Sequence, residues 1–244
     1  MLSDPSLYLP LLIAGVFAAA FVTGAVGFAD ALILNAVWLH IMPPVAAIPL
    51  VVSCGIVMHA APLWKLCKKL DFSRLMPFVI GGLFGVPVGI WALGQVDPGL
   101  FKTMIGGLLV AYGIWMFARP NTTVGEVGGR ALDGAVGLSG GFMGGFGGLS
   151  GLFPTLWTGI RGWPKNKQRG AYQPFVLVMH GLGIAMFAAN GMITERTVQD
   201  FAWCLPAIII GSWLGVKVYP YLNESLFKRI ILGLILISGV TLLI

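Results

Sequence analysis

Apolar segments, separated by short stretches that hold proline, glycine or charge, take up nearly the whole chain. Because a helix bonds its backbone amides and carbonyls internally, a run of about 20 apolar residues can cross a bilayer as one. Only 10% of the residues are charged and the mean hydropathy is +0.91, whereas a soluble domain carries roughly 25% charged residues. We therefore predict an all-α polytopic membrane protein with a single transmembrane domain over residues 1–244.

The short stretches with proline, glycine or charge divide the chain into about ten apolar segments. Two of these segments are too short to cross a bilayer comfortably. The first begins without a basic stretch, so we expect it to be retained rather than cleaved as a signal peptide. The predicted segments are residues 7–28, 31–42, 45–63, 75–93, 99–117, 131–148, 151–160, 172–192, 201–219 and 226–244.

Two apolar stretches are too long to be single helices. Residues 8–42 would form a helix of roughly 52 Å, well beyond a hydrocarbon core of about 30 Å. The chain must turn back, and glycines permit this near residues 24–30 and again near residues 144–150. Whether each short pair is a re-entrant hairpin or two full crossings stays open. Broken helices in matching positions are typical of a transporter's binding site.

The two halves of the chain, approximately residues 7–118 and 131–244, share a weak internal repeat. Its matched features appear in the same order along both halves, which favours a true repeat. The matches pair Gly24 and Gly27 with Gly144 and Gly147, Val57, Met58 and His59 with Val178, Met179 and His180, and Leu100, Phe101 and Lys102 with Leu226, Phe227 and Lys228.

Basic residues orient the predicted repeat. The formal net charge is +6, and Lys and Arg collect in the cytoplasmic loops of membrane proteins. The clusters at residues 65–74, 161–169 and 217–229 therefore mark cytoplasmic loops, and both termini lie outside. Five segments in each half then give inverted repeats, which is a common transporter plan.

Motifs for catalysis or metal binding are missing from the sequence. The cysteines Cys54, Cys67 and Cys204 have no metal-ligand spacing and indicate no disulfide framework. No nucleophile elbow, phosphate loop or HExxH motif occurs. We expect no enzyme activity, no cofactor and no metal.

The glycine breaks and the polar residues around them are the candidate binding site. Consecutive glycines let backbone amides face a ligand, and the start of the following helix favours an anion. Close helix packing is the competing explanation for the glycines. The candidate substrate-binding residues are Gly24, Gly27, Phe28, Asn35, Gly147, Gly148, Ser150, Gly151, Thr155, Gln173 and Arg169.

Three ionisable residues are candidates for proton coupling. Asp30 is the only acidic residue that we place deep in the membrane, where it caps the second segment, carries a proton, or does both. His59 and His180 occupy equivalent positions of the repeat, so they either pack with hydrogen bonds, relay protons or contact the substrate.

Several of these residues carry a resemblance to a known family. Gly24-Ala-Val-Gly-Phe-Ala-Asp-Ala-Leu32 resembles the glycine-phenylalanine-glycine-aspartate-alanine-leucine signature of the sulfite exporter TauE/SafE family, with Ala29 in place of the usual glycine. The second glycine break, the turn Gly162-Trp-Pro164 and the following Arg169 are similar to that family's second motif. A proline that the family carries shortly after the first signature is absent, with Leu34 and Asn35 standing there.

The resemblance implies secondary transport of small anions, such as sulfite and organosulfonates, across a bacterial inner membrane. Our expectation is alternating access to a mid-membrane site between the two breaks, with a coupled proton. A passive anion channel, a cation carrier and a membrane-embedded enzyme are the alternatives. The expected partners are a small anion and the lipid bilayer, with no nucleic acid, and a homodimer is left open.

Overall fold

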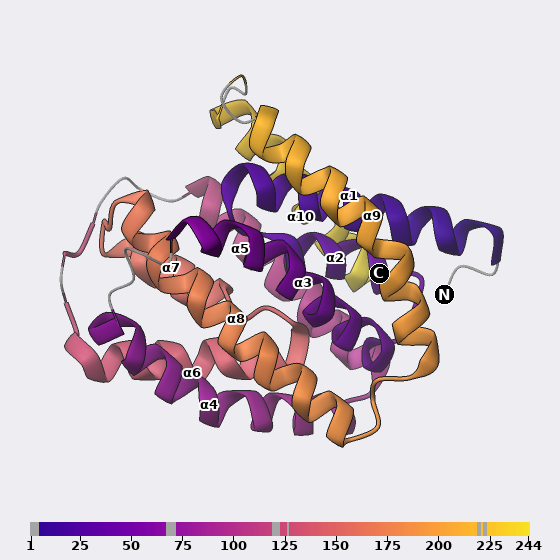
Figure 1. The fold of residues 1–244 in the computed structure, drawn as a ribbon, viewed down its shortest axis with the longest axis horizontal. Coiled ribbons are helices and arrows are strands. Elements are labelled where there is room, and N and C mark those ends of the chain that lie inside the picture. The colour runs from indigo at the N-terminus through magenta and orange to yellow at the C-terminus, as the bar shows by residue number, and fades with distance from the viewer. Residues whose placement is uncertain (1–4, 67–71, 119–122, 126, 219–220, 222–223) are drawn as a thin grey trace.

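A computed structural model describes residues 5–66, 72–118, 123–125, 127–218, 221 and 224–244. Within these residues every regular element is a helix, which confirms the all-α prediction (Figure 1). A short 3-10 turn at Pro5–Leu7 precedes α1. The α-helices are α1 (Tyr8–Val26), α2 (Asp30–Trp38), α3 (Pro44–Leu66), α4 (Phe72–Gln95), α5 (Pro98–Ala118), α6 (Gly129–Gly147), α7 (Leu152–Ile160), α8 (Lys165–Ala189), α9 (Glu195–Val218) and α10 (Glu224–Leu243).

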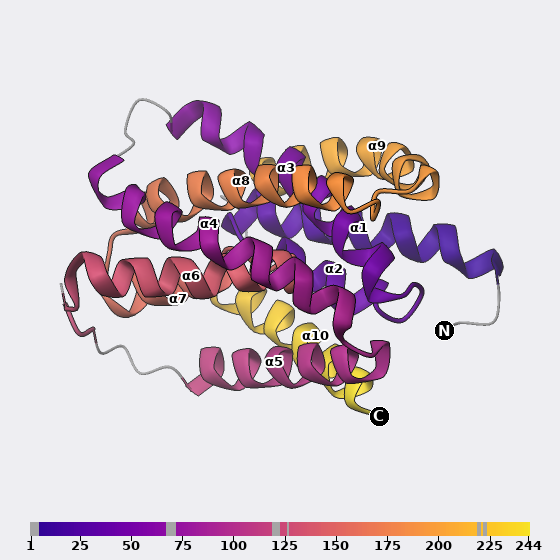
Figure 2. The same cartoon turned by 90° about the horizontal axis from the view of Figure 1, so that it is seen from below.

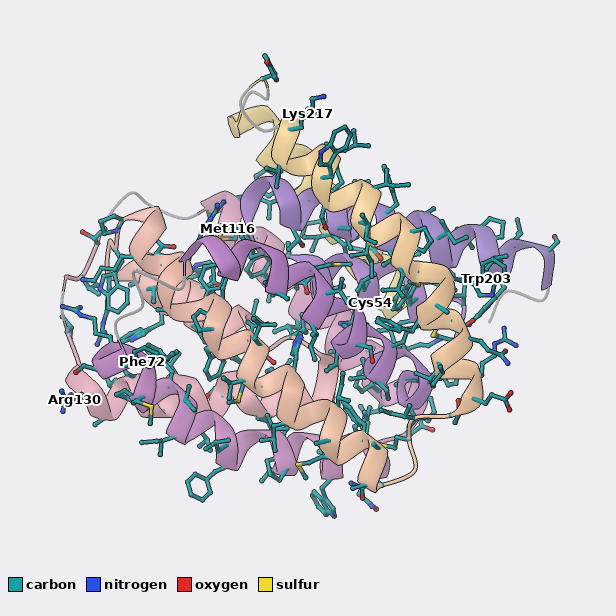
Figure 3. All side chains as sticks on the ribbon, in the orientation of Figure 1. Cys54, Phe72, Met116, Arg130, Trp203 and Lys217 are labelled. Atoms are coloured by element: carbon teal, nitrogen blue, oxygen red, sulfur yellow. The ribbon has the colours of Figure 1, made fainter. Side chains whose placement is uncertain are left out.

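Length and composition identify a membrane protein. Among the described residues, five helices are long and apolar enough to cross a bilayer: α1, α4, α5, α8 and α9. Large apolar side chains also cover the outer surface, as Phe72 and Trp203 illustrate (Figure 3). Contiguous exposed apolar surface of this kind is unusual for a soluble monomer and suits a surface in contact with lipid.

The helix pairs α1–α2 and α6–α7 are hairpins that turn back inside the protein. The indole Nε1 of Trp38, at the end of α2, donates to the carbonyl of Leu12 near the start of α1 at 3.3 Å. Likewise Trp157 in α7 donates to Asp133 near the start of α6 at 2.8 Å. Since α2 and α7 have 9 residues each, each is only about 13.5 Å long. The geometry therefore selects re-entrant hairpins over full crossings.

The two hairpins start from opposite ends of the molecule. At one end α1 and α9 begin together, where the hydroxyl of Tyr8 donates to Asp200 at 2.5 Å. At the other end α4 and α6 begin together, where Arg130 donates to Ser73 at 3.0 Å. We call the second the basic end, because Arg74, Arg130, Arg161, Lys167 and Arg169 lie there, and the first the opposite end. α1 begins and α10 ends at the opposite end (Figure 2).

Helix pairing follows the order of the predicted repeat. The most extensive contacts join α1 to α9, α4 to α6 and α5 to α10, followed by α3 to α8 and, to the same extent, α4 to α8. The predicted repeat makes each helix equivalent to the one five places along the chain. Under that equivalence the α1–α9 and α4–α6 pairs exchange, the α3–α8 and α5–α10 pairs are unchanged, and the α4–α8 pair corresponds to α3–α9, which is also in contact. Two halves related by a two-fold axis produce this pattern. The exact repeat boundaries stay a prediction.

Glycines let the paired helices approach closely. An ideal Cβ on Gly24 in α1 would lie 2.5 Å from the carbonyl oxygen of Ser212 in α9, and one on Gly85 in α4 would overlap the carbonyl of Leu138 in α6. Only glycine permits backbone contact at these points, which is the small-residue packing typical of membrane helices. The packing interpretation therefore accounts for Gly24 as well as for the spaced glycines of α4.

Candidate functional site

The tips of the two hairpins meet in the protein interior, between α3 and α8. Asn35 in α2 joins them, because its Nδ2 donates to its own helix at Ala31 and to Gly147 at the tip of the other hairpin, both at 2.8 Å. His59 of α3 and His180 of α8 lie beside this junction, with their ring centroids 6.3 Å apart. The helix breaks seen in the sequence therefore lie at one shared place.

Asp30 is the first residue of α2 and points at His59. Its Oδ2 lies 3.2 Å from Nε2 of His59, and both side chains are buried. The prediction that Asp30 is the N-cap is wrong, because Ala29 holds the N-cap position and Asp30 is the first residue of the helix. A carboxylate in the first turn is nevertheless favoured by the helix dipole. Ala29 has φ 84°, a left-handed conformation that no other non-glycine residue of the described chain adopts.

His180 is fixed by the other hairpin. Its Nε2 lies 3.3 Å from the carbonyl oxygen of Gly148, and since a carbonyl only accepts, the hydrogen of a neutral ring lies on Nε2. Gly55 of α3 makes room for the ring, because an ideal Cβ there would lie 2.6 Å from Cε1 of His180 and 3.2 Å from Oδ2 of Asp30. The Nδ1 atoms of His59 and His180 are buried without a hydrogen-bond partner.

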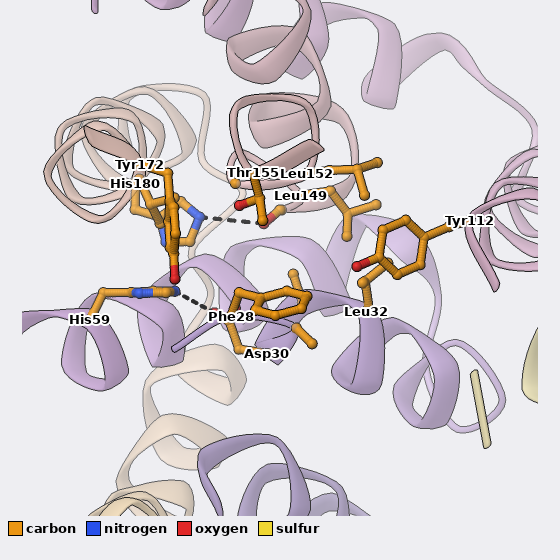
Figure 4. A pocket seen from close by; sticks show the side chains of 15 residues that line it. Phe28, Asp30, Leu32, His59, Tyr112, Leu149, Leu152, Thr155, Tyr172 and His180 are labelled. Atoms are coloured by element: carbon orange, nitrogen blue, oxygen red, sulfur yellow. Dashed lines mark hydrogen bonds and ion pairs between the residues drawn. The ribbon is translucent and has the colours of Figure 1, made fainter. Parts of the chain in front are cut away.

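A small cavity of about 30 Å³ lies at this junction. Polar side chains gather on one side of it and leucines with Tyr112 on the other (Figure 4). The volume is enough for one or two waters and for nothing larger. The lining residues are Phe28, Ala29, Asp30, Ala31, Leu32, His59, Tyr112, Gly148, Leu149, Gly151, Leu152, Thr155, Tyr172, Val176 and His180.

Three side chains of α8 hold the tip of the first hairpin. The hydroxyl of Tyr172 donates to the carbonyl of Gly27 at 2.9 Å, and Gln173 donates to the same oxygen at 3.4 Å. Arg169 donates to the carbonyl of Ala25 at 3.5 Å. The last carbonyls of a helix lack intrahelical partners, and a cation near them is favoured by the helix dipole.

The predicted site residues fall into three groups. Those that line the cavity are Phe28, Asp30, His59, Gly148, Gly151, Thr155 and His180. Those that join or hold the tips without lining the cavity are Gly27, Asn35, Gly147, Arg169 and Gln173. Ser150 is buried against Gly144, and Gly24 lies away from the cavity, against α9.

Sequence reasoning did not single out Tyr172, Tyr112 or Gly55. Tyr172 lies three residues after Arg169 on the same face of a helix, so the spacing itself was a usable signal. Tyr112 comes from α5, whose place beside the cavity depends on the packing of distant segments. Gly55 resembles any other packing glycine until His180 is placed against it.

A second polar cluster closes the base of the second hairpin at the basic end. Arg161 pairs with Asp133 at 2.8 Å and donates through Nη2 to the carbonyl of Val127 at 2.5 Å. Its guanidinium also lies 4.6 Å from the centre of the Trp157 ring. Arg161 is therefore a buried residue that joins α7 to α6, as well as part of a basic cluster. Among the described residues, the carboxylates of Asp133 and Asp200 are also buried besides that of Asp30, but both lie near helix ends.

Comparison with models of protein families identifies the family of this chain. Residues 11–242 match the family model described as Sulfite exporter TauE/SafE, which is nearly the whole chain. No curated protein and no solved structure matches the chain.

Proposed function

The chain belongs to the sulfite exporter TauE/SafE family, and we propose that it is a secondary transporter of small anions, with sulfite or a small organosulfonate as substrate. The observation that carries this proposal is the meeting of two hairpins, which start from opposite ends, around one small cavity that has Asp30 and two histidines on one side. A site at such a junction can be exposed to either side by moving one half against the other. We place the protein in a bacterial inner membrane, with the basic end in the cytoplasm.

The anion is bound by backbone amides at the first turns of two helices, α2 and α7. The first residues of α2, Asp30 to Leu32, line the cavity, and so do Gly151 and Leu152 at the start of α7. First-turn amides have no earlier carbonyl to bond within the helix, and the positive end of each helix dipole attracts an anion.

The Asp30–His59 pair couples anion binding to a proton. With His59 neutral the pair carries one negative charge, which repels an anion in the same cavity. Adding one proton makes the pair neutral, so proton and anion each favour the binding of the other. Lower pH should therefore tighten substrate binding, and a proton should move with each anion.

The cavity is too small for the substrate in this conformation. Its volume of about 30 Å³ admits water only, whereas a sulfonate has four heavy atoms in its head group alone. The structure therefore corresponds to a closed state, and transport requires a hairpin tip to move away from α3 or α8.

Flux into proteoliposomes tests this proposal. Sulfite or methanesulfonate uptake by the wild-type protein should saturate and should accelerate with a proton gradient. Asp30→Asn should abolish the dependence on the gradient, while Glu195→Gln, which changes an exposed carboxyl at the start of α9, should not alter it. Flux that never saturates and ignores pH in the wild type would indicate a channel.

A further inference from the structure

Gly27 and Gly148 are the left-handed C-cap residues of α1 and α6, so they hold the same structural place at the two hairpin tips although the sequence repeat pairs Gly27 with Gly147. Gly27 has φ 88° and Gly148 has φ 71°. An ideal Cβ on Gly27 would lie 2.9 Å from Nε of Arg169 and 3.0 Å from the hydroxyl of Tyr172, while one on Gly148 would lie 2.6 Å from Cγ1 of Val51. The 121-residue offset that aligns His59 with His180 aligns Ile48, Val51 and Val52 with Arg169, Tyr172 and Gln173.

We call the contact of Arg169, Tyr172 and Gln173 with the tip of the first hairpin the basic-end seal. This seal is polar and includes a cation. Arg169, Tyr172 and Gln173 hold the carbonyls of Ala25 and Gly27 through hydrogen bonds of 3.5, 2.9 and 3.4 Å. The seal lies on the basic-end side of His180, because Arg169 is close to the start of α8. Two of these three hydrogen bonds are long, and a neutral carbonyl is a weaker partner for a guanidinium than an oxyanion that accepts two N–H groups.

The equivalent contact of Ile48, Val51 and Val52 with the tip of the second hairpin, which we call the Val51–Val52 seal, has no polar side chain. Ile48, Val51 and Val52 are at most 1% exposed, and Val51 packs directly on Gly148. It lies on the opposite-end side of His59, because α3 begins at that end. Opening this seal exposes apolar surface, and an anion does nothing to reduce that cost.

We propose that the unlike seals make anion loading one-sided: the substrate anion opens the basic-end seal by drawing the Arg169 guanidinium away from the carbonyl of Ala25, whereas the Val51–Val52 seal opens without help from the anion. A ligand shifts a conformational equilibrium only through its different affinities for the two states. When the basic-end seal opens, the anion gains the guanidinium of Arg169 as a partner, so it binds the open state more tightly. When the Val51–Val52 seal opens, the anion gains no partner, so it binds both states equally. This inference rests on the proposed transport function and adds the side on which substrate loads.

Cysteine accessibility measures the seal without requiring transport. Thr155, a cavity residue, is changed to cysteine in a full-length chain whose three native cysteines are replaced by alanine, and an impermeant maleimide is applied from each side of proteoliposomes. Methanesulfonate should raise the rate of labelling from the basic end several-fold. Arg169→Gln should raise the rate without anion and abolish the response, and labelling from the opposite end should not respond.

Tyr172→Phe provides a milder variant that removes one hydroxyl from the seal, with Tyr221→Phe, which removes the hydroxyl of an exposed tyrosine away from the cavity, as its matched control. The first should raise labelling from the basic end, and the second should not. In flux assays with substrate supplied from one side at a time, Arg169→Gln should raise the half-saturation concentration about tenfold from the basic end and leave the other side within twofold.

The two ideas fail in different ways. Methanesulfonate-dependent labelling without any flux would refute transport and leave the seal as an anion-responsive latch. Saturable flux together with equal effects of Arg169→Gln on both sides, or with labelling that ignores both the anion and the substitution, would overturn one-sided loading.

Discussion

The contact between Gly55 and His180 gives the sharpest test of the site. Changing Gly55 to alanine adds one methyl group on α3, 2.6 Å from Cε1 and 2.7 Å from Nδ1 of His180. Ordinary contacts begin near 3.4 Å, so the ring must withdraw by about 0.8 Å. The bond from Nε2 to the carbonyl of Gly148 is already 3.3 Å long, and a further shift of that size takes it beyond hydrogen-bonding distance.

The cost follows from the groups left without partners. A buried donor or acceptor that loses its partner costs about 1 to 3 kcal/mol, and the alanine returns about 0.5 to 1 kcal/mol of helix stability. We therefore expect a net loss of up to about 2.5 kcal/mol. For a chain of this size that corresponds to a fall of up to roughly 10 °C in the midpoint of thermal unfolding. Substrate flux should fall as well, because His180 no longer holds the tip of the second hairpin.

Gly181→Ala is the matched control, since it lies next to His180 on α8 and an added Cβ there meets nothing within 4 Å. Thermal unfolding in detergent and flux in proteoliposomes are measured for both variants. The control should unfold at or above the wild-type temperature. If Gly55→Ala were as stable and as active as Gly181→Ala, the seating of His180 against α3 would be refuted.

Three further changes test the packing around the site. Asp133→Asn and Arg161→Gln should each cost about 3 to 5 kcal/mol, because each leaves a buried charge unpaired; the double variant should cost less than the sum in thermal unfolding, and additive costs would contradict the pairing. Gly85→Ala should lower the unfolding midpoint by forcing α4 from α6, whereas Gly107→Ala, which meets open space, should not; equal midpoints would argue against the close contact. Ala29→Gly removes the strain of an alanine in the left-handed conformation, about 1 to 2 kcal/mol, and adds the entropy cost of a glycine, about 0.5 to 1 kcal/mol. A small rise in the unfolding midpoint is therefore expected, and a fall would mean that the backbone at position 29 is not strained.

The position of the site was readable from the sequence in part. Consecutive glycines and Asp30 in apolar surroundings marked the two breaks, because backbone and charge are costly in hydrocarbon. The same rule could not assign the role of each residue. Gly24 looked like a ligand-facing glycine and packs against Ser212 instead, and Asp30 looked like a helix cap and binds His59. Both roles depend on a partner from a distant helix.

Sequence alone determined the class of the protein: apolar length dictates membrane helices, and the glycine breaks show where two of them stop. The family signature was visible as well, including the alanine at position 29. Only the tertiary structure decided that the short pairs turn back from opposite ends, that their tips meet between His59 and His180, and that one tip is sealed by Arg169 and the other by Val51. The physical reason is that hydrophobicity and backbone bonding act within a segment, whereas the partner of a buried polar group is fixed by which helices pack together.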